Sequence, residues 1–379
     1  MFERLLKKAL SKKFFQGKAI VIAGARQTGK TTLSLELIHE FSDKKVKIFN
    51  CDNPTDREVL ENRDLEFLKQ LVGDVQFVII DEGQKVENIG QTLKLLVDHY
   101  KKKKQIIVTG SSSFNLLEST SEALTGRKYV YNLYPLSVEE IYGKDQLTLL
   151  KELETLLIFG SYPEVVTKKS FDGKRELLKE LSSSYLYQDI LEFHRIKNSS
   201  TLANLIKCLA LQIGSEVSYT ELAVTIGVDK KTVENYVDLL EKNFVIFKLS
   251  PYSKNKRKEI SKLKKIYFYD LGIRNAIINN FNFLDSRNDV GALWENFMIA
   301  ERLKYRAYHQ IYADHFFWRT YDGSEVDLVE EREGKLFGYE FKWNEKKKKR
   351  KSPQAWADYE KSSYEEINRK NLKNFIIKP

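Results

Sequence analysis

The sequence GARQTGKTT, from Gly24 to Thr32, matches the phosphate-binding pattern G-x-x-x-x-G-K-[ST] at every fixed position. Residues 19–23 before it are all apolar and predict a buried strand, and the leucines after it predict a helix. A phosphate-binding loop needs this order, because backbone N–H groups at a helix N-terminus attract anionic oxygens. A glycine turn that binds nothing would leave the Lys-Thr pair unexplained. We therefore expect the whole loop to bind a nucleotide: Gly24, Ala25, Arg26, Gln27, Thr28, Gly29, Lys30, Thr31 and Thr32.

Two side chains of the loop and two further carboxylates have expected roles in hydrolysis. Lys30 would reach the β- and γ-phosphates, and Thr31 would ligate Mg²⁺. A second apolar strand, residues 75–80, ends in Asp81 and Glu82. Asp81 would hold Mg²⁺ through water, and Glu82 would polarise the water that attacks the γ-phosphate. An Asp-Glu pair can also simply end a strand as a turn or helix cap. The prediction is a catalytic centre with ATP and Mg²⁺ as cofactors.

Two further strands are predicted to bring polar groups to the nucleotide. The strand at 105–110 leads into serines, so Thr109 or Ser111 would sense the γ-phosphate; alternatively, the serines would cap the next helix. Arg127 precedes the predicted fifth strand at 128–133. We expect it to donate a bidentate fork to a γ-phosphate, either its own or that of a neighbouring subunit.

Composition bounds the class of protein. The chain has 379 residues, a length that predicts two to four globular domains. Its net charge is +10 and its isoelectric point is near 9.1. Its two cysteines, Cys51 and Cys208, are far apart, so neither a disulfide framework nor a zinc site is expected. No apolar run approaches the ~18 residues that a membrane span requires. We expect a cytoplasmic protein with no membrane partner.

Residues 202–269 show the pattern of a winged helix-turn-helix. Helices are predicted at 202–213, 217–223 and 230–241, and strands at 244–249 and 265–269. Residues suited to helix caps or to a turn stand between these helices: Ser218, Gly227 and Asp229.

A DNA partner is predicted from the charges of this region. The exposed face of its third helix would enter a major groove, and the segment between the two strands is rich in Lys and Arg for phosphate contacts. The residues expected to bind DNA are Lys230, Lys231, Thr232, Asn235, Lys256, Arg257 and Lys258. The alternative is a winged helix that packs against protein, which Glu234 and Asp238 on the same helix favour.

The C-terminal region contains a candidate nuclease site. Asp327 lies in a predicted strand, 323–330, and Glu340 and Lys342 lie in the next, giving the pattern D…E-x-K. Two carboxylates can hold a divalent metal for phosphodiester cleavage, and Glu295 in an upstream helix could add a ligand. The pattern resembles that of restriction-endonuclease-like PD-(D/E)XK proteins. The alternative is that the carboxylates only form surface ion pairs with Lys342 and Arg302, in a domain that holds DNA or protein without cleaving.

The order of several motifs resembles that of a known family. The runs GARQTGKTT, IIDEGQ, VTGSSS, LTGR, LYPLSVEE and FGSYPEVV are similar to those of the large prokaryotic family of AAA+-type ATPases, often called archaeal-type or AAA_14 ATPases, that carry an accessory C-terminal domain of unknown function. The resemblance covers nearly the whole chain. It implies a five-stranded parallel core, a helical lid around Tyr162 to Leu191, and a winged helix that continues into KIYFYDLGIRNAI. Gly83 stands where relatives usually have Ala, and we expect no effect on the chemistry.

The predicted fold class is α/β: a P-loop NTPase of the AAA+ type with a parallel sheet and a helical lid, followed by a winged helix and a small α/β restriction-endonuclease-like domain. The expected domains are the ATPase core at 1–150, the lid at 151–200, the winged helix at 201–285 and the nuclease-like domain at 286–379. The expected function is Mg²⁺-dependent ATP hydrolysis in association with DNA, with a homo-oligomer as a further expectation. The alternative is a signalling or scaffolding ATPase whose C-terminal domains bind a protein partner.

Overall fold

The computed structural model describes residues 2–39, 41, 43–111, 124–183, 199–253, 263–320, 322–344 and 352–378. Contacts divide the chain into two compact units, one of residues 1–135 with 242–244 and one of residues 136–241 with 245–379. Residues 136–150, expected to end the ATPase core, pack within the second unit. The domain boundaries given above stay predictions.

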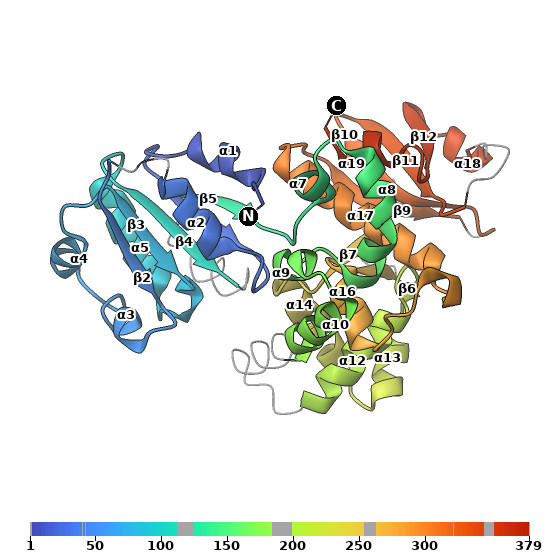
Figure 1. The fold of residues 1–379 in the computed structure, drawn as a ribbon, viewed down its shortest axis with the longest axis horizontal. Coiled ribbons are helices and arrows are strands. Elements are labelled where there is room, and N and C mark those ends of the chain that lie inside the picture. Colours follow the sequence, from blue (N-terminus) through green and yellow to red (C-terminus); the bar gives the residue numbers. More distant parts are fainter. Residues whose placement is uncertain are drawn as a thin grey trace. The chain divides into compact units, whose positions relative to one another are not determined.

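The first unit is built on a five-stranded sheet with the order β2-β3-β4-β1-β5 (Figure 1). Every neighbouring pair is parallel. Since parallel strands end at a common edge, the loops after them meet there. The sheet confirms the predicted α/β P-loop fold. The strands are β1 (Ala19–Ala23), β2 (Val46–Asn50), β3 (Phe77–Asp81), β4 (Gln105–Gly110) and β5 (Lys128–Asn132).

Strands β1, β3 and β4 are buried along their whole length. Their apolar runs do not alternate with polar residues, because helices cover both faces of a parallel sheet. Figure 1 labels the α-helices of this unit around the sheet. The helices are α1 (Leu6–Ser11), α2 (Lys30–His39), α3 (Pro54–Glu58), α4 (Leu65–Val72), the 3-10 helix η1 (Gly83–Lys85) and α5 (Ile89–Tyr100).

The second unit contains a seven-stranded mixed sheet with the order β12-β11-β10-β9-β7-β8-β6. The hairpins β7–β8 and β10–β11 lie where the sequence predicts them. Their union in one sheet was not predicted: Ser250 of β7 pairs in parallel with Phe316 of β9. The strands are β6 (Glu216–Val217), β7 (Ile246–Pro251), β8 (Lys264–Phe268), β9 (Asp314–Arg319), β10 (Glu325–Arg332), β11 (Lys335–Phe341) and β12 (Ser362–Ile367).

The helices of the second unit pack around this sheet and one another. Of the lid expected around Tyr162 to Leu191, residues 184–191 lie outside the described part of the chain. The helices are α7 (Val138–Tyr142), α8 (Gln146–Phe159), α9 (Pro163–Thr167), α10 (Phe171–Glu180), α12 (Ser199–Leu211), α13 (Tyr219–Ile226), α14 (Lys230–Lys242), α16 (Leu271–Ile277), η3 (Leu284–Ser286), α17 (Val290–Tyr308), α18 (Gln354–Ala357) and α19 (Leu372–Ile376).

The helix caps predicted in this unit are confirmed. The Ser218 side chain accepts a hydrogen bond from the backbone N–H of Glu221 at the start of α13. The Asp229 side chain accepts one from the N–H of Thr232 at the start of α14. Gly227 ends α13 with φ of 73°, a left-handed conformation that glycine adopts without strain.

Two motifs that carry the family resemblance pack against each other. Helix α8 ends at Phe159 and is capped by Gly160. The Asp270 carboxylate accepts hydrogen bonds from the N–H groups of Ser161, just after this helix, and of Ile273 in α16. A Cβ atom added at Gly272 would lie 2.2 Å from the carbonyl oxygen of Phe159. The motifs FGSYPEVV and DLGIRNAI therefore join α8 to α16.

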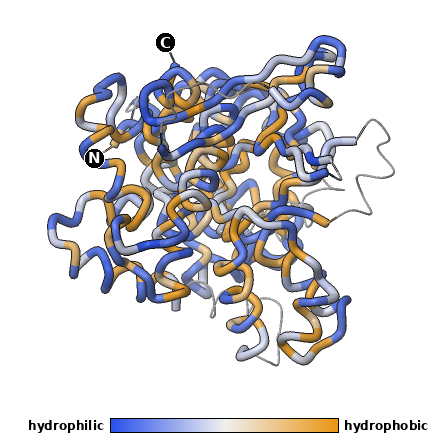
Figure 2. The backbone as a smooth tube through the Cα atoms, turned by 90° about the vertical axis from the view of Figure 1, so that its right-hand side faces the viewer, coloured by the Kyte–Doolittle hydropathy of each residue, from blue (hydrophilic) through white to orange (hydrophobic). Residues whose placement is uncertain are grey.

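Among the described residues, none of the helices is both long and apolar enough to cross a membrane. Figure 2 shows short hydrophobic stretches that alternate with hydrophilic ones along the chain. The cytoplasmic location stays a prediction.

Candidate active site

The phosphate-binding loop connects β1 to α2, as the sequence predicts. A Cβ atom at Gly24 would lie 2.1 Å from the carbonyl oxygen of Leu133, so only glycine lets the chain pass here. Gln27 and Gly29 turn the loop with φ of 59° and 92°. Thr28 is buried and its hydroxyl donates to the carbonyl of Ala25 at 2.8 Å, whereas the side chains of Arg26, Gln27, Thr31 and Thr32 are exposed.

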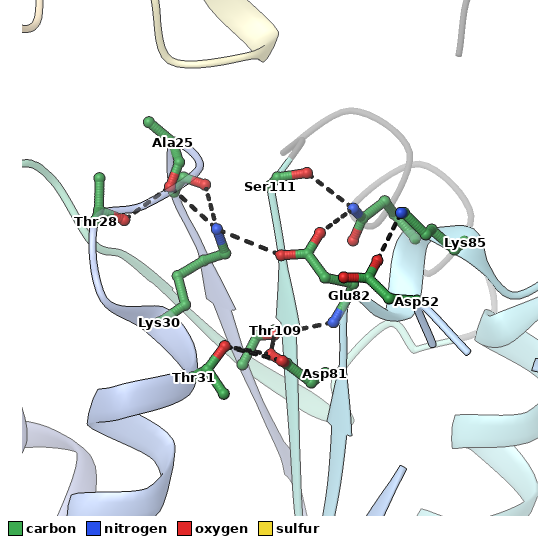
Figure 3. Close-up of polar contacts among 12 residues, drawn as sticks. Ala25, Thr28, Lys30, Thr31, Asp52, Asp81, Glu82, Lys85, Thr109 and Ser111 are labelled. Carbon is green, nitrogen blue, oxygen red and sulfur yellow. Dashed lines mark hydrogen bonds and ion pairs between the residues drawn. The ribbon is translucent and has the colours of Figure 1, made fainter. Parts of the chain in front are cut away.

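Lys30 is buried at the centre of this loop. Its Nζ donates to the carbonyl oxygens of Gly24 and Ala25 at 3.1 and 3.0 Å, and lies 3.7 Å from Oε1 of Glu82 (Figure 3). Burial lowers the pKa of Lys30, and the negative charges of Glu82 and Asp81 oppose this shift. The ammonium group is therefore held between the loop and the acidic pair that ends β3.

Thr31 and Asp81 meet, as expected of two groups that share a magnesium ion. The Thr31 hydroxyl donates to both carboxylate oxygens of Asp81, at 2.8 and 3.0 Å (Figure 3). The hydroxyl of Thr109 also donates to Asp81. Hydroxyl and carboxylate oxygens are ligands that Mg²⁺ prefers, so the residues present fit this ion.

Glu82 has a backbone conformation that is rare outside glycine, with φ of 53°. Its N–H donates to Oγ1 of Thr109 at 3.1 Å, which fixes the turn after β3. Its side chain accepts a hydrogen bond from Nε2 of Gln84 at 2.6 Å, and the same nitrogen donates to Oγ of Ser111 at 2.8 Å. Both predicted sensors thus lie beside the acidic pair. The sensor role of Thr109 and Ser111 stays a prediction.

Two residues of this site were missed by the sequence reasoning. Gln84 stands in the motif IIDEGQ, but no spacing rule assigns it a role. Arg4 is buried, and its guanidinium donates to the carbonyl oxygens of Thr28 and Tyr134 at 2.6 and 2.7 Å. Nothing in the sequence around Arg4 connects it to a loop more than twenty residues away.

Gly83 is more constrained than expected. A Cβ atom there would lie 2.6 Å from Cγ1 of Val108 in β4. An alanine at this position therefore requires the Val108 side chain, or the backbone that carries it, to move.

The placement predicted for Arg127 is wrong. The sequence analysis put it near the edge of the sheet that binds ligand, but Ala19 pairs with Lys128, so Arg127 lies where β1 begins. The phosphate-binding loop follows the other end of β1. Parallel strands start at one edge of the sheet and end at the opposite edge. Arg127 therefore lies far from the phosphate-binding loop of its own chain. Its Nε donates to Asp98 at 2.5 Å. A role toward a neighbouring subunit stays a prediction.

The candidate nuclease residues of the second unit gather at one place. Nζ of Lys342 lies 2.5 Å from Glu340, and Oδ2 of Asp327 accepts a hydrogen bond from the N–H of Phe341 at 2.7 Å. Burial raises the pKa of Asp327 well above its usual value, and the nearby carboxylates Glu295 and Glu340 add to this shift.

A buried lysine from β8 lies among these carboxylates. Nζ of Lys265 lies 3.2 Å from Glu295 and also pairs with Glu325. Burial works to lower the pKa of Lys265, but the charges of Glu295, Glu325 and Asp327 outweigh it and raise that pKa. In the described part of the chain, no group of three or more His, Cys, Asp or Glu side chains is arranged to hold a metal ion. The metal site expected from two carboxylates stays a prediction, as does phosphodiester cleavage, and we derive no cleavage step from this cluster.

The residues expected to bind DNA are only partly described. Lys230, Lys231 and Asn235 are exposed on α14, and Thr232 is half-buried. Nζ of Lys230 lies 3.3 Å from Glu234. Lys256, Arg257 and Lys258 lie outside the described residues.

The parallel sheet, the loop after β1 and the acidic pair after β3 define a P-loop ATPase of the AAA+ type. Residues 16–142 match the family described as AAA domain. Residues 150–283 and 290–375 match two domains of unknown function, DUF8612 and DUF4143. The chain therefore combines an AAA ATPase domain, which implies nucleotide binding and ATPase activity, with the C-terminal domain DUF4143. The family resemblance drawn from the sequence is confirmed.

Two relatives that align with most of the chain are described as uncharacterized proteins. An uncharacterized protein of Mycobacterium tuberculosis is 27% identical over 335 residues, which are 88% of this chain and 72% of that protein. An uncharacterized protein of Methanocaldococcus jannaschii is 26% identical over 345 residues, 86% of this chain and 75% of that protein. Among solved structures, AMPPCP-bound DnaA from Aquifex aeolicus has a TM-score of 0.28 and 15% identity, covering 63% of this chain and 85% of that one.

Proposed function

We propose that the protein hydrolyses Mg²⁺-bound ATP at the edge of the first sheet, with Lys30, Thr31, Asp81 and Glu82 as the central residues. The observation that carries the proposal is the 3.7 Å approach of Lys30 Nζ to Glu82, next to the contact between Thr31 and Asp81. Four side chains from two separate motifs thus meet at the position where a γ-phosphate, a metal ion and a water molecule are needed.

Each side chain has a chemical task in this proposal. Lys30 leaves the loop carbonyls and binds the β- and γ-phosphate oxygens. Thr31 and Asp81 hold Mg²⁺, which neutralises the charge that develops on the phosphates when it is bound. Glu82 accepts a proton from the attacking water.

Two substitutions test this proposal. Lys30→Ala removes the cation and should abolish ATP binding, measured by calorimetry. Glu82→Gln keeps shape and binding but removes the base, so phosphate release should fall by about 10²–10⁴-fold. Chelation of Mg²⁺ should stop turnover in the unaltered protein. Equal turnover in Glu82→Gln and the unaltered protein would exclude Glu82 as the base. Unchanged ATP binding in Lys30→Ala would contradict the proposal.

We further propose that the second unit associates with DNA through α14. The proposal rests on the exposed side chains of Lys230, Lys231 and Asn235, at the start of a helix that follows a capped helix and a glycine turn. In a winged helix this position faces the major groove. Retention on duplex DNA should weaken as salt rises, because phosphate contacts release counterions. Lys231→Ala should weaken it further, and a protein with no salt-dependent retention on any DNA or RNA would contradict this proposal.

A protein partner is the second candidate for this region. Val224 on α13 has 80% of its surface exposed, and Lys230 pairs with Glu234 instead of standing alone. ATPase rates with and without DNA, together with the mass of the protein in ATP, separate the two candidates. Stimulation by DNA supports the first, whereas a DNA-independent rate with no retention supports the second. The mass also tests the expected homo-oligomer.

A further inference from the structure

Gln84 connects the proposed catalytic base to the end of β4. Its Nε2 donates one hydrogen bond to Oε2 of Glu82 at 2.6 Å and one to Oγ of Ser111 at 2.8 Å. An amide nitrogen carries two protons, so both are used. The side chain is buried, with 8% of the Gln84 surface exposed.

The orientation of this amide is set by its neighbours. An ionised carboxylate only accepts hydrogen bonds, so the reversed amide would place an oxygen against an oxygen of Glu82. Within the described residues, the buried Oε1 of Gln84 has no hydrogen-bond partner in the orientation observed. An unsatisfied buried acceptor is unfavourable, and the two bonds from Nε2 compensate for it. Gln84 is therefore held by its contacts to Glu82 and Ser111.

The contact also determines which way Glu82 points. Gln84 donates to Oε2 of Glu82, while Oε1 of the same carboxylate lies 3.7 Å from Nζ of Lys30. Since Lys30 belongs to the phosphate-binding loop, Oε1 faces the side on which the γ-phosphate would bind. The bond from Gln84 thus favours a Glu82 side chain turned toward the reaction and not away from it.

We infer that Gln84 is a positioning residue for ATP hydrolysis, which holds the Glu82 carboxylate toward the attacking water and ties it to Ser111. The inference rests on the proposed ATPase function of the same site. Gln84 needs no contact with the nucleotide, so its loss affects turnover and not ATP binding.

The matched variants are Gln84→Ala and Lys85→Ala. Lys85 is the next residue of η1, but its ammonium pairs with Asp52 at 2.6 Å, outside this chain of contacts. In Gln84→Ala, kcat should fall about 10- to 100-fold while KM and the melting temperature stay close to those of the unaltered protein. Lys85→Ala should keep kcat. Equal kcat in the unaltered protein and Gln84→Ala would overturn the inference.

Two further measurements exclude a purely structural role. Gln84→Glu places a second negative charge beside Glu82, which favours protonation of that carboxylate, so the acidic limb of the pH–rate profile should move to higher pH. In a Glu82→Gln background, adding Gln84→Ala should cause little further loss, because the residue acts through Glu82. Losses that multiply in the double variant, or an unmoved pH profile, would overturn the inference. A wild-type protein without ATP turnover would overturn the proposed function and this role together. If the wild type is active, the kcat of Gln84→Ala tests the role of Gln84 alone.

Discussion

Arg4 ties the phosphate-binding loop to the chain that follows β5, through bonds to the carbonyls of Thr28 and Tyr134. Arg4→Met keeps much of the side-chain volume but leaves both carbonyls without this donor, at a cost of about 1–3 kcal/mol. We expect ATP to bind about tenfold more weakly, because a loop that moves binds phosphate less well. Titration with a fluorescent ATP analogue measures the effect.

Lys8→Met is the control for Arg4. Lys8 lies four residues after Arg4, in helix α1, and 84% of its side chain is exposed. It should bind nucleotide like the unaltered protein. Unchanged affinity in Arg4→Met would show that the loop keeps its shape without the guanidinium.

We expect His315 to make the stability of the second unit sensitive to acid. Burial and the charge of Arg306 lower the pKa of His315 from 6.5 to about 4. The unfolded chain then binds a proton at higher pH than the folded chain does. Stability from this group is complete above pH 6.5 and is lost as pH falls toward 4, by at most ~3 kcal/mol, since the residue is only half-buried.

His315→Phe should remove this part of the pH dependence. All four tryptophans of the chain lie in the second unit, so their fluorescence follows its unfolding selectively. Urea unfolding at pH 7.5 and pH 5 should show a smaller difference in the variant. An identical difference in both proteins would assign the acid sensitivity to other groups.

The side chains proposed for catalysis could be found in the sequence because their spacing is local. Lys30 and Thr31 follow a loop pattern, and Asp81 and Glu82 end an apolar strand. Arg127 could not be placed correctly, because the edge at which it lies depends on strand direction, which is a property of the assembled sheet. Gln84 and Arg4 act through hydrogen bonds that no pattern of residues encodes.

Helix α8 and helix α16 approach each other through glycines. The carbonyl oxygen of Phe159 occupies the space that a side chain at Gly272 would need. Gly272→Ala should therefore destabilise the second unit by about 1–3 kcal/mol, as overpacking does in other proteins. Gly291→Ala in α17 is the matched control, because a Cβ atom there meets nothing within 4 Å.

The control should be neutral or stabilising by up to about 1 kcal/mol, since alanine favours a helix more than glycine does. Tryptophan fluorescence during urea unfolding measures both variants. Equal stability of Gly272→Ala and Gly291→Ala would contradict the prediction, because it would mean that α16 moves away from Phe159 without loss of stability.

Individual helices, caps and hairpins were predicted from the sequence, but their union was not. Ser218, Gly227 and Asp229 end or begin helices where their local chemistry requires it. The pairing of β7 with β9 joins residues more than sixty positions apart, and hydrophobic patterns do not specify which strands become neighbours.

The seven-stranded sheet makes a division at the expected boundary of 285 unfavourable. A chain that ends at Asp285 loses β9 and also α17, whose Asn296 bonds to both backbone groups of Phe268 in β8. We expect residues 1–285 to aggregate, because the edge of β7 is left unpaired. Residues 136–379 keep the whole sheet and should unfold cooperatively. Light scattering and tryptophan fluorescence compare the two, and a monodisperse 1–285 chain would contradict this prediction.

The pairing of β7 with β9 also has an evolutionary consequence. Genes exchange segments most readily where the encoded pieces fold alone, and here one sheet crosses from the region matched at 150–283 into the region matched at 290–375. A recombination event between these two regions would separate β7 from β9, with which it pairs. We therefore expect these two regions to be inherited as one piece, while the ATPase domain before them remains free to recombine with other partners.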